Sequence, residues 1–511
     1  MIHSQFSKLT LIASIALSLS LSACGGSKSV ETDTPPPINN TAPPVNDTTP
    51  PVNTTEPLAG VWQAPAYGLM LDIQADTHQF YQITSEFCQR FELDLEHSEL
   101  ISNTQLSDDT NSLVTSLTGL KVPGMTMNKE NSLPDICLND LIANRGESNY
   151  QFDAQRDFEI FWQTFNEYYA FFDIEGVDWD EVFQLANNQI SPQTTQARLI
   201  EILIDMVEPL QDFHVRVVNE QSGINFSVFR KPSLIDLAVQ DFVLTRQVEL
   251  PFNDAQVETF DIYFDEAIDL SIDAIMSHLV IDTDIEENVN GTLFWGKFDN
   301  NIGYVNFGSM DLEDFGASGN SVDQNKAILA ENLDEIMQYF ADVDGIIIDV
   351  RYIGRGSGDA LVSLEIVSRF TEQFLTLYSK QARLGDSRTA LTSVIAGPEG
   401  STQFLGPVAL MTSATTSGAA EIFAMSMRQR ANTTLIGEAT AGGFSDSLVK
   451  TLPHGTEYSL SNEFHLTPDN EEYEGVGVPV DIEQVFFTIE QREQGIDLGL
   501  EKAEEWIMQQ Q

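Results

Sequence analysis

The chain has 511 residues, which at roughly 150 residues per domain predicts about three domains. Hydrophobic residues make up 42% and charged residues 20%, a composition typical of globular proteins that excludes a wholly disordered chain. The 78 acidic and 25 basic residues give a net charge of −53, so the surface repels phosphate backbones and we expect no nucleic-acid partner.

The first residues have the pattern of an export signal. Lys8 precedes an apolar run over 11–21 that is too short to span a bilayer stably. The run ends in Leu-Ser-Ala-Cys-Gly, which resembles the bacterial lipoprotein processing site, and an ordinary secretory signal with an incidental cysteine is the alternative. We therefore expect residues 1–24 to be a lipoprotein signal peptide and Cys24 to carry lipid as the protein's membrane contact. Gly25, where an Asp would favour inner-membrane retention, favours the outer membrane of a Gram-negative cell envelope.

A tether and a small β domain follow the signal. Residues 25–56 are rich in Pro, Thr and Asn and cannot form a core, so we expect a tether without fixed structure. Residues 57–148 contain short β-rich runs separated by polar turns, which predicts a small β domain. With Cys24 lipidated, the remaining thiols are Cys88 and Cys137, and in an exported protein we expect a disulfide between them. A metal or nucleophilic role is the alternative, but no His or further Cys stands at ligand spacing.

A helical subdomain is predicted over residues 150–220. Aromatic residues recur at three- and four-residue steps between Phe158 and Phe172, which makes one broad apolar face of a helix. A second apolar helix runs through 199–207 and is ended by Pro209, shortly before His214. Core packing explains the aromatic face, with ligand binding as the alternative. Residues 221–298 show no clear period, so we leave them as an unassigned connecting region.

Strands and helices alternate over residues 299–485, which is typical of an α/β domain with parallel strand pairs. A C-terminal helical tail is expected over 486–511, and the sequence shows no internal repeat and no membrane span after the signal. The predicted strands cover 302–307, 345–351, 407–411 and 433–437.

Ser417 stands where an apolar strand turns into a helix. A hydroxyl at that point lies at the carboxyl end of a sheet, close to helix N–H groups that stabilise negative charge. This is a suitable position for a nucleophile. Serine is also a preferred helix N-cap, so capping is the alternative explanation.

Four blocks of the sequence resemble the serine peptidase family of tail-specific (C-terminal processing) proteases and the tricorn protease core. They are Ile348-Asp349-Val350-Arg351 with its glycine turn, Thr416-Ser417-Gly418-Ala419-Ala420-Glu421, Gly437-Glu438-Ala439-Thr440-Ala441-Gly442-Gly443 and Glu474-Gly475-Val476-Gly477-Val478-Pro479. The helical segment ending in Leu210-Gln211-Asp212-Phe213-His214 is also similar to the part that precedes the core in some members. The resemblance implies an α/β, ClpP/crotonase-like spiral core, a protein or peptide substrate, and neither metal nor cofactor.

Members of this family differ in their general base. Tail-specific proteases use a Lys after a Gly-Glu-x-Thr-x-Gly segment, where this chain has Gly442-Gly443, so Lys450 is only a fallback base. The tricorn-like branch uses a His and a late Glu, which match His214 and Glu474. An imidazole is matched to neutral pH, and a carboxylate can stabilise its charged form. The resemblance thus implies Ser417 as nucleophile, His214 as base and Glu474 as its support.

Three departures from the family pattern bear on activity. The oxyanion hole is expected from the backbone N–H groups of Gly418 and of the turn around Gly356, but Ile353 and Arg355 replace the usual Asn and Gly of that turn. Phe213 replaces the Ser that precedes the His in tricorn-like members. No glycine-rich carboxylate-binding loop of the PDZ type is apparent between 220 and 298.

The sequence therefore predicts a lipid-anchored envelope serine endopeptidase. One alternative is a catalytically inactive relative that binds peptide or an apolar ligand in the former active-site cleft. A second is that the β domain carries the main function by binding an envelope protein or a glycan.

Overall fold

The computed structural model describes residues 57–228, 230–279, 285–317, 319–354 and 358–511. The predicted signal peptide, Cys24 and the tether over 25–56 lie outside the described residues, as does Gly356. Within the described ranges, no helix is long and apolar enough to cross a membrane.

The N-terminal part forms the predicted β domain, built on one seven-stranded sheet in the order β4-β3-β2-β1-β7-β6-β5. Its strands are β1 (Gly60–Ala64), β2 (Leu69–Ile73), β3 (His78–Ile83), β4 (Cys88–Phe91), β5 (Thr104–Leu106), β6 (Ser112–Thr115) and β7 (Met125–Glu130), with helices α2 (His97–Ser102) and α3 (Asp135–Asn139). A disulfide joins Cys88 of β4 to Cys137 of α3, with 5.2 Å between their Cα atoms.

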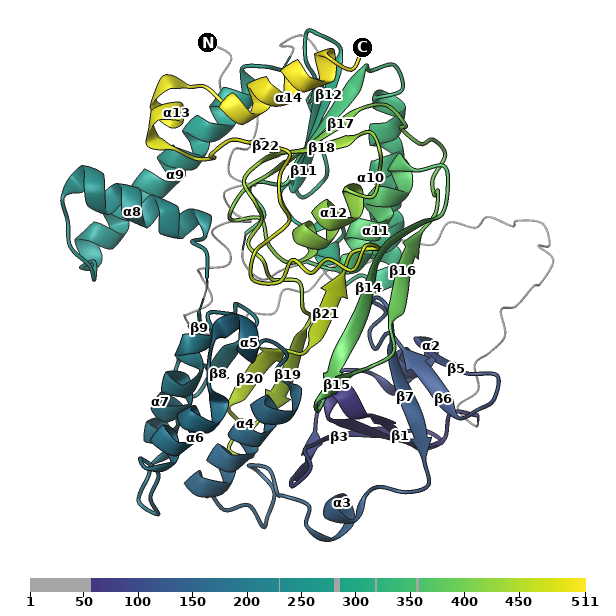
Figure 1. Cartoon of the computed structure of the whole chain (residues 1–511), viewed down its shortest axis with the longest axis vertical. Coiled ribbons are helices and arrows are strands. Elements are labelled where there is room, and N and C mark those ends of the chain that lie inside the picture. Colours follow the sequence, from purple (N-terminus) through teal and green to yellow (C-terminus); the bar gives the residue numbers. More distant parts are fainter. Residues whose placement is uncertain (1–56, 229, 280–284, 318, 355–357) are drawn as a thin grey trace, which may run out of the picture.

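The helical subdomain contains strands that the sequence did not indicate. Its helices are α4 (Ala154–Tyr168), α5 (Phe172–Glu175), α6 (Trp179–Asn187) and α7 (Gln196–Val207). They pack beside a sheet in the order β19-β20-β8-β9, made of β8 (Arg216–Asn219), β9 (Ile224–Ser227), β19 (Ser447–Thr451) and β20 (Glu457–Ser461). The predicted boundary at residue 299 is therefore incomplete, because β19 and β20 leave the core to complete this subdomain (Figure 1).

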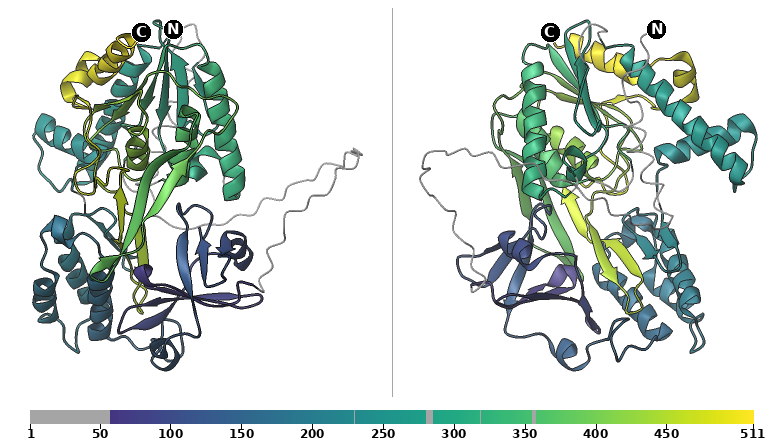
Figure 2. Two further views of the ribbon diagram at one scale, coloured as in Figure 1. Left: turned by 45° about the vertical axis from the view of Figure 1, so that its right-hand side comes forward. Right: turned by 180° about the vertical axis from the view of Figure 1, so that it is seen from behind.

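The unassigned region contains two helices, α8 (Leu234–Arg246) and α9 (Asp254–Met276). Both begin with a side-chain capping box, at Ser233 and at Asn253. Their apolar residues are spread around the helix rather than along one stripe, which is why periodicity did not reveal them. Together with the C-terminal helices α13 (Ile489–Gln494) and α14 (Leu498–Met508) they lie along one side of the core (Figure 2).

The α/β core is a seven-stranded sheet in the order β10-β11-β12-β13-β17-β18-β22, in which β12 through β22 are parallel. This confirms the predicted α/β class. Its strands are β10 (Glu286–Glu287), β11 (Leu293–Lys297), β12 (Ile302–Phe307), β13 (Gly345–Asp349), β17 (Val408–Thr412), β18 (Thr433–Gly437) and β22 (Ile482–Glu483), and its helices are α10 (Val322–Tyr339), α11 (Ala360–Val367) and α12 (Ala419–Met427). Four strands, β14 (Leu375–Leu384), β15 (Ser387–Arg388), β16 (Thr392–Ala396) and β21 (Glu463–Leu466), form a separate ribbon beside it. Short 3-10 helices cover Pro65–Tyr67, Glu208–Leu210, Leu312–Phe315 and Ser368–Phe370.

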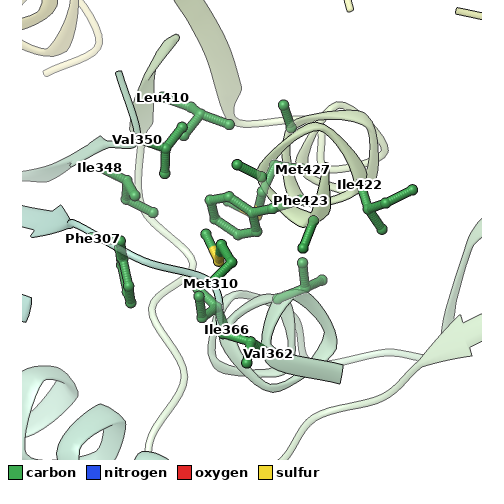
Figure 3. Close-up of a cluster of buried hydrophobic side chains, with 14 of the residues drawn as sticks. Phe307, Met310, Ile348, Val350, Val362, Ile366, Leu410, Ile422, Phe423 and Met427 are labelled. Atoms are coloured by element: carbon green, nitrogen blue, oxygen red, sulfur yellow. The ribbon is translucent and has the colours of Figure 1, made fainter. Parts of the chain in front are cut away.

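Both faces of the parallel sheet are buried, as its continuous apolar strands predict. Ile348 and Leu410 face α11 and α12 (Figure 3), and α10 packs in the same apolar cluster. On the other face, Ile347 and Met411 pack with α9 and α14. The C-terminal tail is thus one layer of the core. It is fixed by Arg351, whose guanidinium binds the carboxylates of Asp349 and Asp497 at 2.7–3.0 Å.

Candidate active site

Ser417 lies at the carboxyl end of β17, in the turn that leads into α12. The preceding turn is pinned to the end of β13, because Ser413 and Thr415 donate to the carbonyl of Arg351 at 2.8 and 3.0 Å and Thr416 donates to that of Val350 at 3.1 Å. Ser417 is only 4% exposed, and its Oγ has no hydrogen-bond partner among the described residues. The N-cap of α12 is Gly418, so capping does not account for this serine.

Gly418 adopts φ 62°, a conformation that a side chain rarely tolerates. Its N–H, one of the two predicted oxyanion donors, donates to Glu421 Oε2 at 3.3 Å. This bond is long, so the donor is available to a stronger acceptor. The other predicted donor, Gly356, lies outside the described residues.

Glu421 is a buried carboxylate that belongs to the second sequence block but had no predicted role. It accepts the Thr440 hydroxyl and the N–H of Gly442, both at 2.6 Å, and the N–H of Gly443 at 2.9 Å. Burial raises its pKa, against these hydrogen bonds. Glu421 therefore ties the glycine turn after β18 to the first turn of α12. The sequence signal for this role was the presence of one acidic residue in an otherwise apolar helix.

His214 is held at the edge of the helical subdomain by its backbone. Its carbonyl accepts the Ser459 hydroxyl at 2.6 Å, and its N–H donates to Asp212 Oδ1 at 2.9 Å. On the ring, Nδ1 lies 3.3 Å from Ser461 Oγ and 3.9 Å from Asp212 Oδ1. Burial lowers the pKa of His214, partly offset by Asp212, which keeps the ring neutral and able to accept a proton near pH 7.

Glu474 is not joined to the imidazole by any hydrogen bond in the part of the chain that the structure describes. Its Oε2 instead accepts the N–H groups of Phe444 and Ser445 at 2.9 and 3.1 Å. Burial and the nearby charge of Asp212 raise its pKa well above the usual range. The carboxylate next to Nδ1 is that of Asp212, which sequence reasoning quoted in the Leu-x-Asp-x-His block but did not assign.

Ser417 and His214 border two different spaces. Ser417, Asp212, Phe213 and Glu474 line a small cavity of about 30 Å³. His214 and Gly418 line a groove of about 450 Å³ between the core and the β domain. The Phe213 ring lies against the His214 ring, with 4.1 Å between the ring centroids and an interplanar angle of 39°, and it fills the space next to Gly443, where a Cβ would lie 1.7 Å from it. No hydrogen bond joins Ser417 to His214 within the described ranges.

Lys450, the fallback base, belongs to neither space. Its ammonium donates to the carbonyls of Tyr67 and Gly68 at 2.7 and 2.9 Å, at the contact with the β domain. Burial lowers its pKa to about 7. The structure thus corrects the sequence interpretation, because Lys450 is desolvated as a base must be but is placed to anchor a domain.

One group of side chains has metal-ligand character. The carboxylates of Asp446 and Glu463 and the ring of His465 place ligand atoms within 4.8 Å of one another. The ammonium groups of Lys121 and Lys380 bind the same two carboxylates at 2.7–3.2 Å. Because two cations already neutralise these carboxylates, the donor set does not suit a divalent metal ion.

Comparison with known proteins agrees with this geometry. Residues 301–484 match the family model of peptidase family S41. These residues therefore form a peptidase S41 domain, and the family supports a serine peptidase. No curated protein matches the chain.

One solved structure supports the fold, and others are similar with lower scores. A putative peptidase from Parabacteroides merdae ATCC 43184 superposes with a TM-score of 0.53 at 23% identity, over 70% of this chain and 98% of that one. Mature CPAF matches at 13% identity over 70% and 95% of the two chains, with a TM-score of 0.47. The tricorn protease matches at 13% identity over 86% of this chain and 43% of its own, with a TM-score of 0.39.

Proposed function

We propose that this protein is a lipid-anchored serine endopeptidase of the bacterial cell envelope. The observation that carries the proposal is the Ser417 hydroxyl, which is buried, without a hydrogen-bond partner among the described residues, and located at the start of a helix in a peptidase S41 domain. An unsatisfied buried hydroxyl costs free energy, and such costs are characteristic of groups kept for chemistry.

In the proposed reaction, Ser417 Oγ attacks the carbonyl carbon of a peptide bond and His214 accepts the hydroxyl proton. The C–N bond then breaks, and His214 returns the proton to the leaving amine. Water hydrolyses the acyl-enzyme with His214 again as the base. The N–H of Gly418 stabilises the oxyanion, while Asp212 and Glu474 are the carboxylates available to support the imidazolium. Closure of the helical subdomain onto the core is required first, to bring His214 to the serine.

A silent relative that binds peptide is the second candidate. It is favoured by the absence of a Ser417–His214 hydrogen bond in the described residues and by Phe213 on the imidazole. Such a protein would bind peptides without cleaving them.

The deciding experiment incubates the full chain with a denatured protein mixture and detects new peptide termini by mass spectrometry. We expect Ser417→Ala and His214→Ala each to reduce cleavage at least about 1,000-fold. Ser426→Ala is the matched control, since Ser426 is another buried serine on α12 whose Oγ has no partner among the described residues. Wild-type protein that yields no more termini than Ser417→Ala would support the silent relative.

Lipid anchoring needs its own test. Cells grown with labelled palmitate should label the wild-type chain, and Cys24→Ser should abolish the label and release the protein from the membrane fraction. Unchanged labelling in Cys24→Ser would contradict the anchor without touching the peptidase proposal.

A further inference from the structure

The groove beside His214 has one wall made by the β domain. Leu93 and Leu117 line it from that domain, and Ile422 and Phe444 line it from the core. Its volume of about 450 Å³ lies within the range of ligand pockets. Because His214 and Gly418 also line it, this groove reaches two of the groups that the proposed reaction uses.

The β-domain wall is firmly built into the molecule. Leu120 and Val122 pack against the main apolar cluster of the core. Lys121 between them binds Asp446 Oδ2 at 2.7 Å and the buried carboxylate of Glu463 at 3.2 Å. Apolar packing and a largely buried ion pair both fix the segment 120–122, so it forms a preorganised surface and not a loosely attached loop.

The charge of the groove is negative. Among the described residues that line it, Lys121 is the cation, and it is paired with Asp446 and Glu463. Asp94 is exposed and makes no side-chain hydrogen bond or ion pair among the described residues, and Asp359 bonds only the N–H of Leu312, at 2.9 Å. The unneutralised groups in the groove are therefore carboxylates, set among apolar side chains.

We infer that this groove binds an extended peptide in which apolar side chains alternate with Lys or Arg, and that the β domain thereby selects the substrate. The inference rests on the proposed function for its location at the catalytic groups, but the binding chemistry is independent of cleavage. Apolar side chains of the peptide cover Leu93 and Leu117, while its cations approach Asp94 and Asp359. The strongly acidic chain would add long-range attraction for such a peptide.

Binding to the full-length Ser417→Ala variant tests the charge. The probes are two fluorescein-labelled octapeptides, one of alternating Leu and Lys and one of alternating Leu and Glu, measured by fluorescence anisotropy. We expect the Leu–Lys peptide to bind more tightly, and Asp94→Lys to weaken it by about threefold, as one exposed charge contact predicts. The matched control is Asp76→Lys, the same charge change at an exposed residue of the same domain that does not line the groove.

A second pair of variants tests the apolar wall. Leu93→Asn should weaken the Leu–Lys peptide by about threefold or more. Leu138→Asn, at a 59% exposed residue of α3 outside the groove, should not. Thermal melting of each variant verifies that the β domain remains folded.

The outcomes separate this inference from the peptidase proposal. Equal binding of the two peptides, or equal effects of Asp94→Lys and Asp76→Lys, would overturn the groove assignment even if Ser417 proves essential for cleavage. The expected binding pattern without any Ser417-dependent cleavage would uphold the groove and reject the peptidase proposal.

Discussion

Two groups of acidic side chains in the region of the candidate site differ in their neutralisation. In the paired group, Asp446 and Glu463 are bound by Lys121 and Lys380 at 2.7–3.2 Å. In the unpaired group, Asp212, Glu421 and Glu474 have no Lys or Arg within ion-pair distance among the described residues.

Because of this difference, the carboxylate pKa values shift in opposite directions in the two groups. Although burial opposes it, the two lysines hold the pKa of Asp446 well below its usual range and lower that of Glu463. Burial without a cation raises the pKa values of Glu421 and Glu474. Fixed charges suit the attachment of one domain to another, whereas carboxylates with raised pKa values suit a site that moves protons.

Removing a cation from the paired group gives the largest expected effect on stability. Lys380→Met leaves Glu463, which is 1% exposed, with fewer cations, and we expect the free energy of unfolding to fall by about 3 kcal/mol in urea denaturation. The pairing is fully present above the unfolded carboxylate pKa values and is lost as pH falls through the lower folded values. The deficit of the variant should therefore shrink in acid.

Lys297→Met is the matched control for this change. Lys297 also makes a 2.6 Å ion pair, but its partner Asp342 is 78% exposed. A loss of less than about 1 kcal/mol is expected there. Equal losses in the two variants would show that the paired group is no more stabilising than a surface contact.

Only part of the fold and of the candidate site could be predicted from the sequence. Continuous apolar strands indicated the α/β core, and the turn at Ser417 indicated a candidate nucleophile, because these features depend on residues close together in the chain. Glu421 and Asp212 stood in the quoted motifs, but their roles depend on the folded turn at Gly442 and on the distance to the imidazole. Lys450 was considered as a base on its position in the sequence alone. Its actual contact, with the carbonyl of Tyr67, joins residues far apart in the chain and could not be read from the sequence.

The helices of residues 234–276 were missed for a related physical reason. α8 and α9 bury apolar residues against the sheet, against each other and against α13, so they lack the single stripe that periodicity detects. The strands β19 and β20 were missed as part of the helical subdomain because they join its sheet through the pairing of β20 with β8, more than 200 residues away in the chain. Long-range pairing of this kind leaves no local pattern.

Within the unpaired group, the two candidate supports of His214 can be compared directly. Because the Asp212 carboxylate lies 3.9 Å from Nδ1 and its charge stabilises the imidazolium, we expect Asp212→Asn to reduce kcat/KM by about thirtyfold, or about 2 kcal/mol. Glu474→Gln should reduce kcat/KM less than about threefold. The hydrogen bonds of Glu474 among the described residues are to backbone N–H groups, and its raised pKa favours the neutral carboxyl, which Gln resembles.

A pH profile distinguishes an electrostatic role of Asp212 from a merely structural one. The charge of Asp212 raises the pKa of His214, so Asp212→Asn should move the acid limb of kcat/KM to lower pH. A larger loss in Glu474→Gln than in Asp212→Asn would instead indicate that closure brings Glu474 to the imidazole.

The smallest expected effect is an influence of the paired group on the base. Burial lowers the pKa of His214 below 6.5, while Asp212, Asp446 and Glu463 raise it in part. The acid limb of kcat/KM should accordingly have its midpoint below pH 6.5. Asp446→Asn removes one of the opposing charges and leaves Lys121 and Lys380 less neutralised, and both changes disfavour the imidazolium. The limb should then move to lower pH in peptide-cleavage assays.

Asp76→Asn removes the same charge from an exposed turn of the β domain and should leave the profile unchanged. An unchanged limb in Asp446→Asn would mean that the paired group is electrostatically silent at the base and serves attachment alone, and a shift to higher pH would contradict the expected sign of its influence. The expected shift would mean that the β domain, through Lys121, helps to set the pH at which His214 accepts a proton. The two acidic groups would then act on one imidazole, the unpaired one through the charge of Asp212, which lies 3.9 Å from Nδ1, and the paired one through the domain contact that also forms the groove.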